Sequence, residues 1–262
     1  MSVSRFELLL YERKGPVVWL TINRPEVRNA INNQILEEIR EAIVQAEAEP
    51  EARAIVLTGA GDRAFCAGGD LQPKTAQFVR DFSRMHLPLV RLAQKAMQSE
   101  LPIVARINGH VMAGGMGLLA IADMAVAVDT AKFGLPEVKI GMFPLQVDAL
   151  LLRLIPRRKL VEMSLTGEPI TAQEALAIGL VNCLAAPAEL DAKLDWLLSR
   201  FLDKAPTAIR LGKQSLEAIS DMTLQQGLTF MAQQLGMMAL TEDSKEGLAA
   251  FAEKREPAWT NR

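Results

Sequence analysis

The sequence predicts an α/β fold with substantial parallel strand pairing, followed by a helical C-terminal region. Two patterns carry this prediction. Between residues 17 and 128, short apolar runs rich in β-branched residues alternate with segments of helical periodicity, which is typical of strand–helix units. After Pro156, helical periodicity dominates. We therefore expect an α/β core over residues 1–195 and a helical region over residues 196–262.

Four short runs are expected to form buried strands. Each is apolar and β-branched, and loop signals such as Asn-Arg-Pro and Asn108-Gly109 follow them. The four runs are residues 17–22, 54–58, 102–107 and 124–128.

Helical periodicity defines the segments between and after these strands. The first helix is expected over residues 29–48, and its apolar face contains Ile31, Ile35, Leu36, Ile39, Ile43 and Val44. A longer helix is expected over residues 75–99, with a kink or break at Pro88, and a short one over residues 114–122. The C-terminal helices are expected at residues 172–178, 189–202, 207–220, 223–238 and 243–253.

Composition narrows the class of protein. The chain has 262 residues, half of them hydrophobic, so it is long enough to bury a core without disulfides or metals. A net charge of −2 gives no electrostatic reason to expect nucleic acid or an anionic membrane as partner. Cys66 and Cys183 lack CxxC spacing, which argues against a zinc site or a redox pair. Without a signal-like or membrane-spanning segment, we expect a cytoplasmic protein with no metal.

Two glycine-rich loops have the composition of loops whose backbone binds a ligand. The first, residues 64–71, contains adjacent glycines whose N–H groups can approach a ligand closely. The second, residues 108–117, leaves a strand and enters an apolar helix, where unpaired N–H groups favour negative charge on oxygen. Either loop could instead contain glycine for turn geometry.

An acidic residue, Glu137, follows Leu-Pro in an otherwise apolar stretch. Burial would raise the pKa of this carboxyl and suit it to proton transfer near neutral pH. An exposed loop glutamate is the alternative.

A dinucleotide fingerprint is a competing interpretation of the second loop. Residues 115–120 fit G-x-G-x-x-A, and Glu137 lies 20 residues after Gly117. However, the acidic residue that contacts a ribose should end the next strand, and Asp129 stands there instead. A nicotinamide-dependent enzyme is therefore the less favoured interpretation, and no P-loop motif is present.

Six segments in order along the chain together resemble the crotonase superfamily, the enoyl-CoA hydratase/isomerase family. They are residues 23–30, 65–71, 108–115, 133–141, 165–181 and 251–255. The resemblance implies repeated ββα units with a helical C-terminal trimerisation region. It also implies a homotrimer or a hexamer formed from two trimers.

The resemblance assigns roles to individual positions. It implies that the backbone N–H groups of Gly69 and Gly114 form an oxyanion hole and that Glu137 is the acid/base. It implies no cofactor, because coenzyme A is part of the acyl-CoA substrate. The substrate- and CoA-binding residues it implies are Arg28, Ala30, Ala67, Gly68, Asp70, Leu71, Gly109, Gly117, Pro136, Phe251 and Lys254.

One departure from the family pattern affects the expected reaction. Two-acid hydratases of this family carry a second glutamate at the position of Gly117, and glycine cannot move a proton. Gln146 or Asp148, in a loop that also departs from the family, could supply a substitute polar group or could be structural. We therefore expect hydration or isomerisation of an enoyl-CoA double bond through an enolate, with Glu137 as single acid/base. Acyl-CoA hydrolysis, decarboxylation and a non-catalytic CoA-binding subunit remain alternatives.

Overall fold

The computed structural model describes residues 6–70 and 87–262, and its larger sheet has the predicted parallel character. This sheet has the strand order β1-β2-β3-β5-β7-β10, and every neighbouring pair except β1 and β2 is parallel. The strands are β1 (Leu9–Lys14), β2 (Val17–Ile22), β3 (Ala54–Gly59), β5 (Ile103–Ile107), β7 (Met124–Val128) and β10 (Cys183–Ala185). All four predicted strands are confirmed, whereas β1 and β10 were not predicted.

The structure has a second, smaller sheet that the local residue patterns did not predict. Its order is β4-β6-β8-β9, with β4, β6 and β8 parallel and β9 antiparallel. The strands are β4 (Ala64–Cys66), β6 (His110–Met112), β8 (Lys132–Gly134) and β9 (Ile170–Thr171). Runs of two or three residues are too short to show the alternation that identifies a strand. Each of these strands comes shortly after a strand of the larger sheet or after a helix. The sequence pattern therefore indicated a loop at each place.

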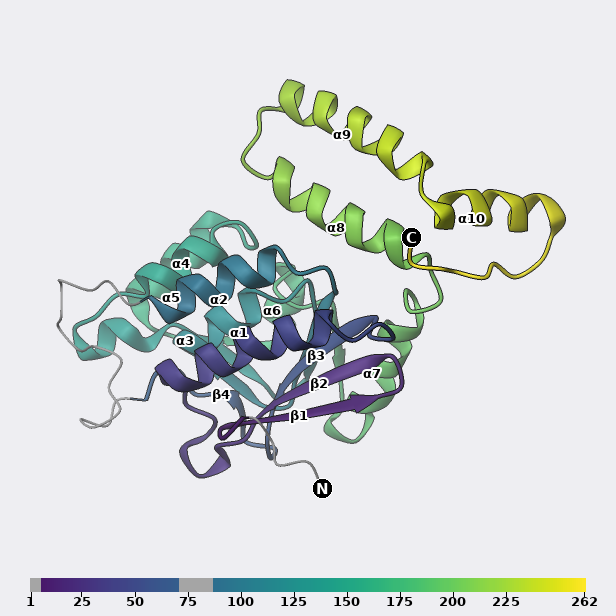
Figure 1. The fold of residues 1–262 in the computed structure, drawn as a ribbon. Coiled ribbons are helices and arrows are strands. Elements are labelled where there is room, and N and C mark those ends of the chain that lie inside the picture. The colour runs from purple at the N-terminus through teal and green to yellow at the C-terminus, as the bar shows by residue number, and fades with distance from the viewer. Residues whose placement is uncertain (1–5, 71–86) are drawn as a thin grey trace.

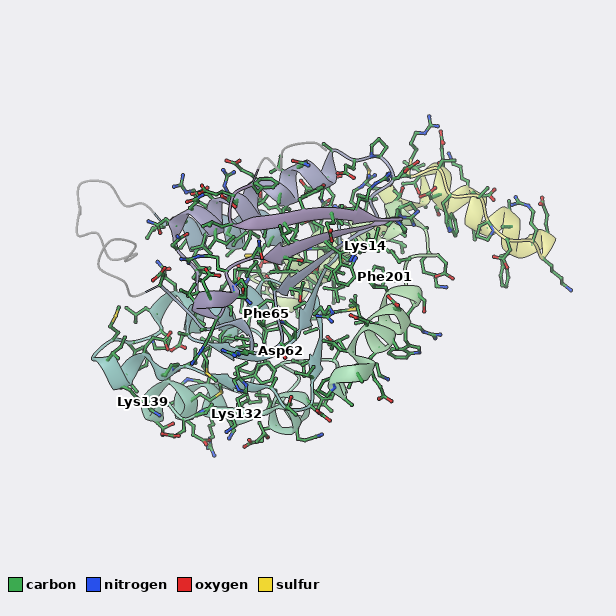
Figure 2. The ribbon with its side chains drawn as sticks, turned by 90° about the horizontal axis from the view of Figure 1, so that it is seen from below. Lys14, Asp62, Phe65, Lys132, Lys139 and Phe201 are labelled. Atoms are coloured by element: carbon green, nitrogen blue, oxygen red, sulfur yellow. The ribbon has the colours of Figure 1, made fainter. Side chains whose placement is uncertain are left out.

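The repeating unit is a long strand, a short strand and then a helix. β3 and β4 precede α2 (Pro88–Met97), and β5 and β6 precede α3 (Gly114–Ala120). The repeated ββα core expected from the resemblance is therefore confirmed. Phe65 of β4 and Phe133 of β8 are fully buried, and Figure 2 shows Phe65 in the interior of the molecule.

Helix α1 (Asn33–Glu47) begins later than predicted. The Asn32 side chain caps it by accepting a hydrogen bond from the Ile35 N–H at 3.0 Å. Residues before the cap cannot be helical, because Arg28 and Asn29 have positive φ angles and Ile31 pairs with Gly69. Val44 was placed on the buried face, but it is 47% exposed.

Helix α2 begins at Pro88, because proline fits the first turn of a helix, where its missing N–H is not needed. The rest of the expected helix, up to residue 86, lies outside the described residues.

The C-terminal half is mainly helical, as predicted. Figure 1 shows helices α8, α9 and α10 extending away from the body that contains both sheets. Two helices before them, α4 (Leu145–Leu151) and α5 (Arg157–Thr166), were not predicted. The remaining helices are α6 (Ala172–Ala177), α7 (Leu190–Ser199), α8 (Pro206–Ile219), α9 (Leu224–Ala239) and α10 (Glu242–Glu253), with short 3-10 turns η1 (Pro25–Val27), η2 (Pro136–Ile140) and η3 (Pro187–Glu189). None of the described helices is both long enough and apolar enough to cross a bilayer.

Candidate active site

The loop after β4 is held against the loop after β2 by backbone pairing. The Ile31 N–H donates to the Gly68 carbonyl at 2.8 Å, and the Asp70 N–H donates to the Ile31 carbonyl at 2.8 Å. Buried Asn29 braces the same region, since its side-chain amide donates to the carbonyls of Ala60 and Ala64. These contacts fix the position of Gly69 between Gly68 and Asp70.

An ion pair ties the two loops together at Asp70. Arg24 Nη2 lies 2.9 Å from Asp70 Oδ2, and the two side chains are only 12% and 3% exposed. The Arg24 guanidinium also donates to the Ala30 carbonyl at 2.6 Å. The contacts seen at Asp70 and Ala30 are therefore structural, and their expected part in CoA binding stays a prediction.

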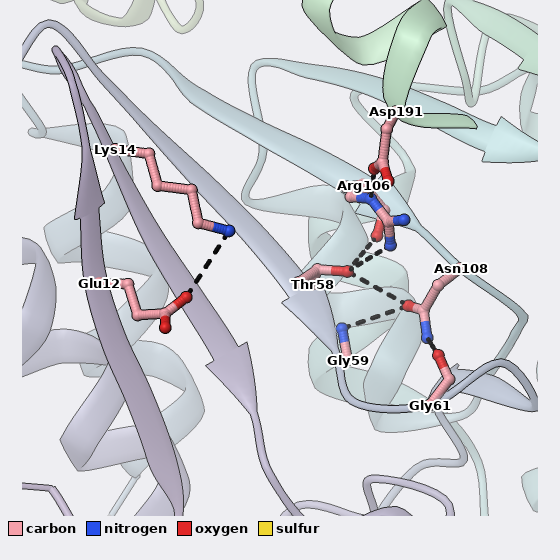
Figure 3. A network of polar contacts seen from close by, with 8 residues as sticks. All are labelled: Glu12, Lys14, Thr58, Gly59, Gly61, Arg106, Asn108 and Asp191. Carbon is pink, nitrogen blue, oxygen red and sulfur yellow. Dashed lines mark hydrogen bonds and ion pairs between the residues drawn. The ribbon is translucent and has the colours of Figure 1, made fainter. Parts of the chain in front are cut away.

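The loop after β5 is fixed by the side chain of Asn108 (Figure 3). Asn108 Oδ1 accepts from the Gly59 N–H at 3.2 Å, while Nδ2 donates to the Gly61 carbonyl at 2.8 Å. Asn108 thereby joins the ends of β3 and β5. This network sets the starting point of β6 and of the glycine-rich turn into α3.

The turn into α3 has a strained backbone. Ala113 has a φ of 49°, in the region that favours glycine, and its N–H donates to the Gly134 carbonyl at 2.9 Å. The next turn packs tightly on β4, because a β-carbon at Gly115 would lie 2.6 Å from the Cys66 carbonyl oxygen. Burial raises the pKa of the Cys66 thiol to about 12, so this cysteine is neutral and is not a nucleophile.

The two predicted oxyanion donors lie side by side. A β-carbon at Gly114 would lie 3.7 Å from the Gly69 nitrogen, and one at Gly68 would lie 3.6 Å from the Gly114 nitrogen. Within residues 6–70 and 87–262, neither the Gly69 nor the Gly114 N–H has a hydrogen-bond acceptor. Two adjacent, unused donors can stabilise an oxygen that gains negative charge.

A mainly apolar cavity of about 430 Å³ brings these donors together with the predicted acid. Its wall is formed by Ala67, Gly69, Leu89, Ala113, Gly114, Pro136, Glu137, Lys139, Ile140, Met142, Phe143, Pro144, Leu145, Gln146 and Val147. The apolar residues of η2 and the start of α4 had no recognisable signal in the sequence, and they suit a hydrocarbon chain.

Glu137 lies in η2 with its carboxyl partly buried. Its Oε2 atom is buried and has no hydrogen-bond partner among the described residues. Burial raises the pKa of Glu137, a hydrogen bond from its own backbone N–H lowers it, and the charge of Asp148 raises it further. A carboxyl with a raised pKa, facing the same cavity as two free N–H donors, can carry a proton to and from a bound molecule.

Gly117 lies behind an apolar wall of this cavity. A β-carbon at this position would touch the side chains of Leu89 at 3.4 Å and Val147 at 3.5 Å. These are ordinary van der Waals contacts, so a side chain at position 117 would begin among two aliphatic side chains. Among the described residues that line the cavity, Glu137 is the single carboxylic acid.

Replacing Gly117 by glutamate is expected to destabilise the fold. The new carboxyl would be buried against Leu89 and Val147, and an unpaired polar group in such surroundings costs roughly 1–3 kcal/mol. Thermal unfolding should show a lower Tm for Gly117→Glu, while Gly117→Ala, whose methyl group makes ordinary contacts, should melt close to the unmodified protein. Equal Tm values for the two variants would contradict this.

A second cavity, of about 720 Å³, is lined by further residues that were predicted to bind CoA. Its wall contains Arg28, Asp62, Arg63, Ala64, Ala67, Gly109, His110, Met112 and Thr130. Ala67 lines both cavities, so both spaces border the loop after β4. Arg63 and Thr130 were missed because neither belongs to a recognisable motif.

The remaining predicted residues do not join these cavities. Phe251 and Lys254 lie at the end of α10, where Phe251 is 86% exposed, and they line neither cavity. Leu71 lies outside the described residues. Glu137 does not end a strand, as the dinucleotide interpretation would require.

Comparison with known proteins gives matches over nearly the whole chain. The sequence profile of the enoyl-CoA hydratase/isomerase family matches residues 12–262. The crotonyl-CoA hydratase of Syntrophomonas wolfei is 34% identical, covering 95% of this chain and 96% of its own length. The (E)-benzylidenesuccinyl-CoA hydratase of Thauera aromatica is also 34% identical, covering 95% and 97%. A crystal structure of an enoyl-CoA hydratase from Mycobacterium smegmatis superposes with a TM-score of 0.91 at 30% identity, covering 97% and 99%.

Proposed function

The chain belongs to the enoyl-CoA hydratase/isomerase family and acts on the carbon–carbon double bond of an enoyl-CoA thioester, and we propose that it does so with Glu137 as its single acid/base. The observation that carries this proposal is the shared cavity. The Glu137 carboxyl and the N–H groups of Gly69 and Gly114 belong to residues that line the same cavity, and this supports the proposal. Hydration is the reaction we favour, because the matched relatives are hydratases.

In the proposed hydration, the Glu137 carboxylate takes a proton from a water molecule as the water oxygen bonds to C3 of a 2-enoyl thioester. The electrons of the double bond move toward the thioester oxygen, which accepts hydrogen bonds from Gly69 and Gly114 in the resulting enolate. One such donor is worth about 3–4 kcal/mol of transition-state stabilisation in other enzymes. Protonated Glu137 then gives its proton to C2, and a 3-hydroxyacyl-CoA is released.

Isomerisation is a second candidate, and the surroundings of Gly117 favour it. Leu89 and Val147 lie next to that position, and Glu137 is the single carboxylic acid among the described residues that line the cavity. In this reaction, Glu137 would take a proton from C2 of a 3-enoyl thioester and return it to C4. The same two N–H groups would hold the dienolate oxygen, and no water would be added.

For the coenzyme, we propose the second cavity as the place where the nucleotide end of CoA binds. Arg28 and Arg63 supply guanidinium groups for its phosphates, and Ala67 connects this space with the acyl cavity. Coenzyme A arrives as part of the substrate, so we propose no separate cofactor.

A paired assay tests the proposed function. Purified protein is given a 2-enoyl-CoA and the matched 3-enoyl-CoA in separate reactions, and the products are resolved by mass. Gain of one water from the 2-enoyl substrate supports hydration, whereas conversion of the 3-enoyl substrate at unchanged mass supports isomerisation. Reaction of neither thioester, with both still bound, would overturn the proposal.

Exposed apolar side chains on α8 and α9 support our proposal that the chain assembles into trimers, which could pair into hexamers. α8 and α9 expose large aliphatic side chains that a single chain leaves in water, such as Leu216 at 65%, Leu228 at 59% and Leu235 at 69%. Exposed apolar area of this kind marks an interface.

We expect light scattering to give three or six times the chain mass, and Leu228→Glu to lower it. The matched control is Val44→Glu, which places the same charge at an exposed apolar position on α1 and should keep the native mass. A monomeric unmodified protein would contradict the assembly.

A further inference from the structure

The acyl cavity has a buried side and an exposed side. Leu89 of α2 and Val147 of α4 line it and are only 8% and 4% exposed, and both would touch a β-carbon at Gly117. Ile140 and Leu145 line the same cavity, yet they are 57% and 74% exposed. The buried pair therefore forms the floor of the cavity, and the exposed pair lies at its opening.

Large apolar side chains gather at this opening, and we call them the apolar rim. They are Ile140, Met142, Phe143 and Leu145, all of them wall residues with exposed fractions between 37% and 74%. Figure 2 shows Lys139, the residue before the rim, at the edge of the molecule. A group of exposed apolar side chains that continues the wall of a cavity is typical of a ligand-binding surface.

Backbone hydrogen bonds tie the apolar rim to the proposed acid. The Met142 N–H donates to the Glu137 carbonyl at 3.0 Å, and the Leu145 N–H donates to the Phe143 carbonyl at 2.8 Å. The rim thus begins within one turn of Glu137. A chain attached to the reacting carbons can reach it without leaving the cavity wall.

The position proposed for coenzyme A leaves the apolar rim to the acyl group. Ala67 is the wall residue shared with the second cavity, and no residue of the apolar rim lines that cavity. A thioester oxygen held by the N–H groups of Gly69 and Gly114 would have its CoA on the Ala67 side. The acyl chain then extends past Glu137 toward the rim, because Leu89 and Val147 close the floor.

The charges in the cavity wall indicate that the end of this chain is neutral. Among the described wall residues, Lys139 is the single cation, and its Nζ lies 2.7 Å from Glu168 Oε1. The Lys139 stem packs on the end of α5, since a β-carbon at Gly167 would lie 3.0 Å from its Cε atom. The charge of Lys139 is therefore compensated there, and the rim offers a chain end mainly apolar contact.

We propose that the apolar rim binds the end of an uncharged acyl chain of medium or greater length, so that such thioesters are better substrates than short ones. A fully buried methylene group strengthens binding about fourfold, and one that lies on an open surface buries about half as much, which corresponds to about twofold. This inference rests on the proposed function, since it narrows the substrate class of the same site.

Binding of saturated acyl-CoAs tests the inference without any reaction, because these thioesters have no double bond. Isothermal titration of the assembled protein compares butyryl-CoA with octanoyl-CoA, which is longer by four methylene groups. We expect octanoyl-CoA to bind roughly tenfold more tightly. Equal or weaker binding of octanoyl-CoA would overturn the inference, and this is also the result expected if a second copy of the chain covers the rim.

Variants of the apolar rim locate the bound chain. In Leu145→Ser and Ile140→Ser, the ratio of octanoyl-CoA affinity to butyryl-CoA affinity should fall about fivefold, because apolar area at the rim is lost. The matched control is Leu152→Ser at the end of α4, which is 54% exposed and lines neither cavity, and it should keep the ratio. An unchanged ratio in both rim variants would overturn the inference.

A floor variant tests the other path for the chain. Leu89→Ala enlarges the buried floor and should leave the ratio of the two affinities unchanged. A higher ratio in Leu89→Ala would place the end of the chain at the floor and would contradict its binding at the rim.

The two thioester experiments separate this inference from the proposed function. Tighter binding of octanoyl-CoA that depends on Leu145 supports the inference even if neither enoyl-CoA reacts. If a short 2-enoyl-CoA is converted but affinity does not rise with chain length, the proposed function stands and the inference is wrong. With an active enzyme, the longer 2-enoyl-CoA should have a lower KM at similar kcat, because contact far from the reacting carbons is the same in ground state and transition state.

Discussion

Glu137→Gln is expected to lower kcat about a thousandfold, within the range that a positioned acid/base contributes. Glutamine has nearly the shape of glutamate but takes up no proton, so both proton transfers at carbon lose their carrier. Glu137 Oε2 has no partner among the described residues, and the amide oxygen of glutamine can still accept the hydrogen bond from the backbone N–H of residue 137. The fold and the binding of a thioester should therefore persist, as measured by circular dichroism and by titration with a saturated acyl-CoA.

The control for this variant is Glu162→Gln. Glu162 is an exposed acid on α5 that pairs with Lys159, and it lies outside both cavities. Its amide variant should retain full activity. If Glu137→Gln also kept most of its activity, water or substrate would have to exchange protons with another group, and the single-acid mechanism would be wrong.

Gly114→Ala is expected to lower kcat/KM by roughly a hundredfold to a thousandfold. The added methyl would lie 3.7 Å from the Gly69 nitrogen, in the space that a thioester oxygen needs in order to reach both N–H groups. The same methyl would approach Ile31 Cδ1 to 2.9 Å. Since that atom ends a flexible side chain, the loop can adjust, and Tm should change little.

A double variant distinguishes these two contacts. Ile31→Val removes the Cδ1 atom that the new methyl would approach, so the combination with Gly114→Ala relieves the packing contact alone. We expect activity to stay low in the double variant, because the oxygen position is still obstructed. Recovery of activity would instead show that the loss came from displaced packing, and the oxyanion role of Gly114 would be refuted.

The larger sheet was predictable because its strands are long enough to show a pattern. β2, β3, β5 and β7 are five or six residues long and mostly buried, so each appears as a continuous β-branched run. β1 was missed because one face is exposed and its polar residues hide the pattern. The start of α1 was misplaced because Arg28 and Asn29 turn with positive φ angles, which periodicity does not reveal.

The candidate site was predictable only where the resemblance named its residues. The cavity unites Gly69, Gly114 and Glu137 as expected, and no local pattern could have shown that their loops meet. The apolar wall around Gly117 also depends on contacts between α2, α3 and α4, which are distant in sequence. Asp148 was considered as a substitute polar group, but its position outside the cavity wall required the structure.

The strained turn at Ala113 places the demands of stability and of catalysis in opposition. A non-glycine residue at this φ stores about 1–3 kcal/mol, directly before the Gly114 donor. Two contacts hold the turn in this conformation: the hydrogen bond from the Ala113 N–H to the Gly134 carbonyl and the packing of Gly115 on Cys66. A relaxed turn would release this free energy, but it would no longer fix the direction of the Gly114 N–H. In this protein, stability would favour a relaxed turn at Ala113, whereas the fixed direction of the Gly114 N–H requires the strained one.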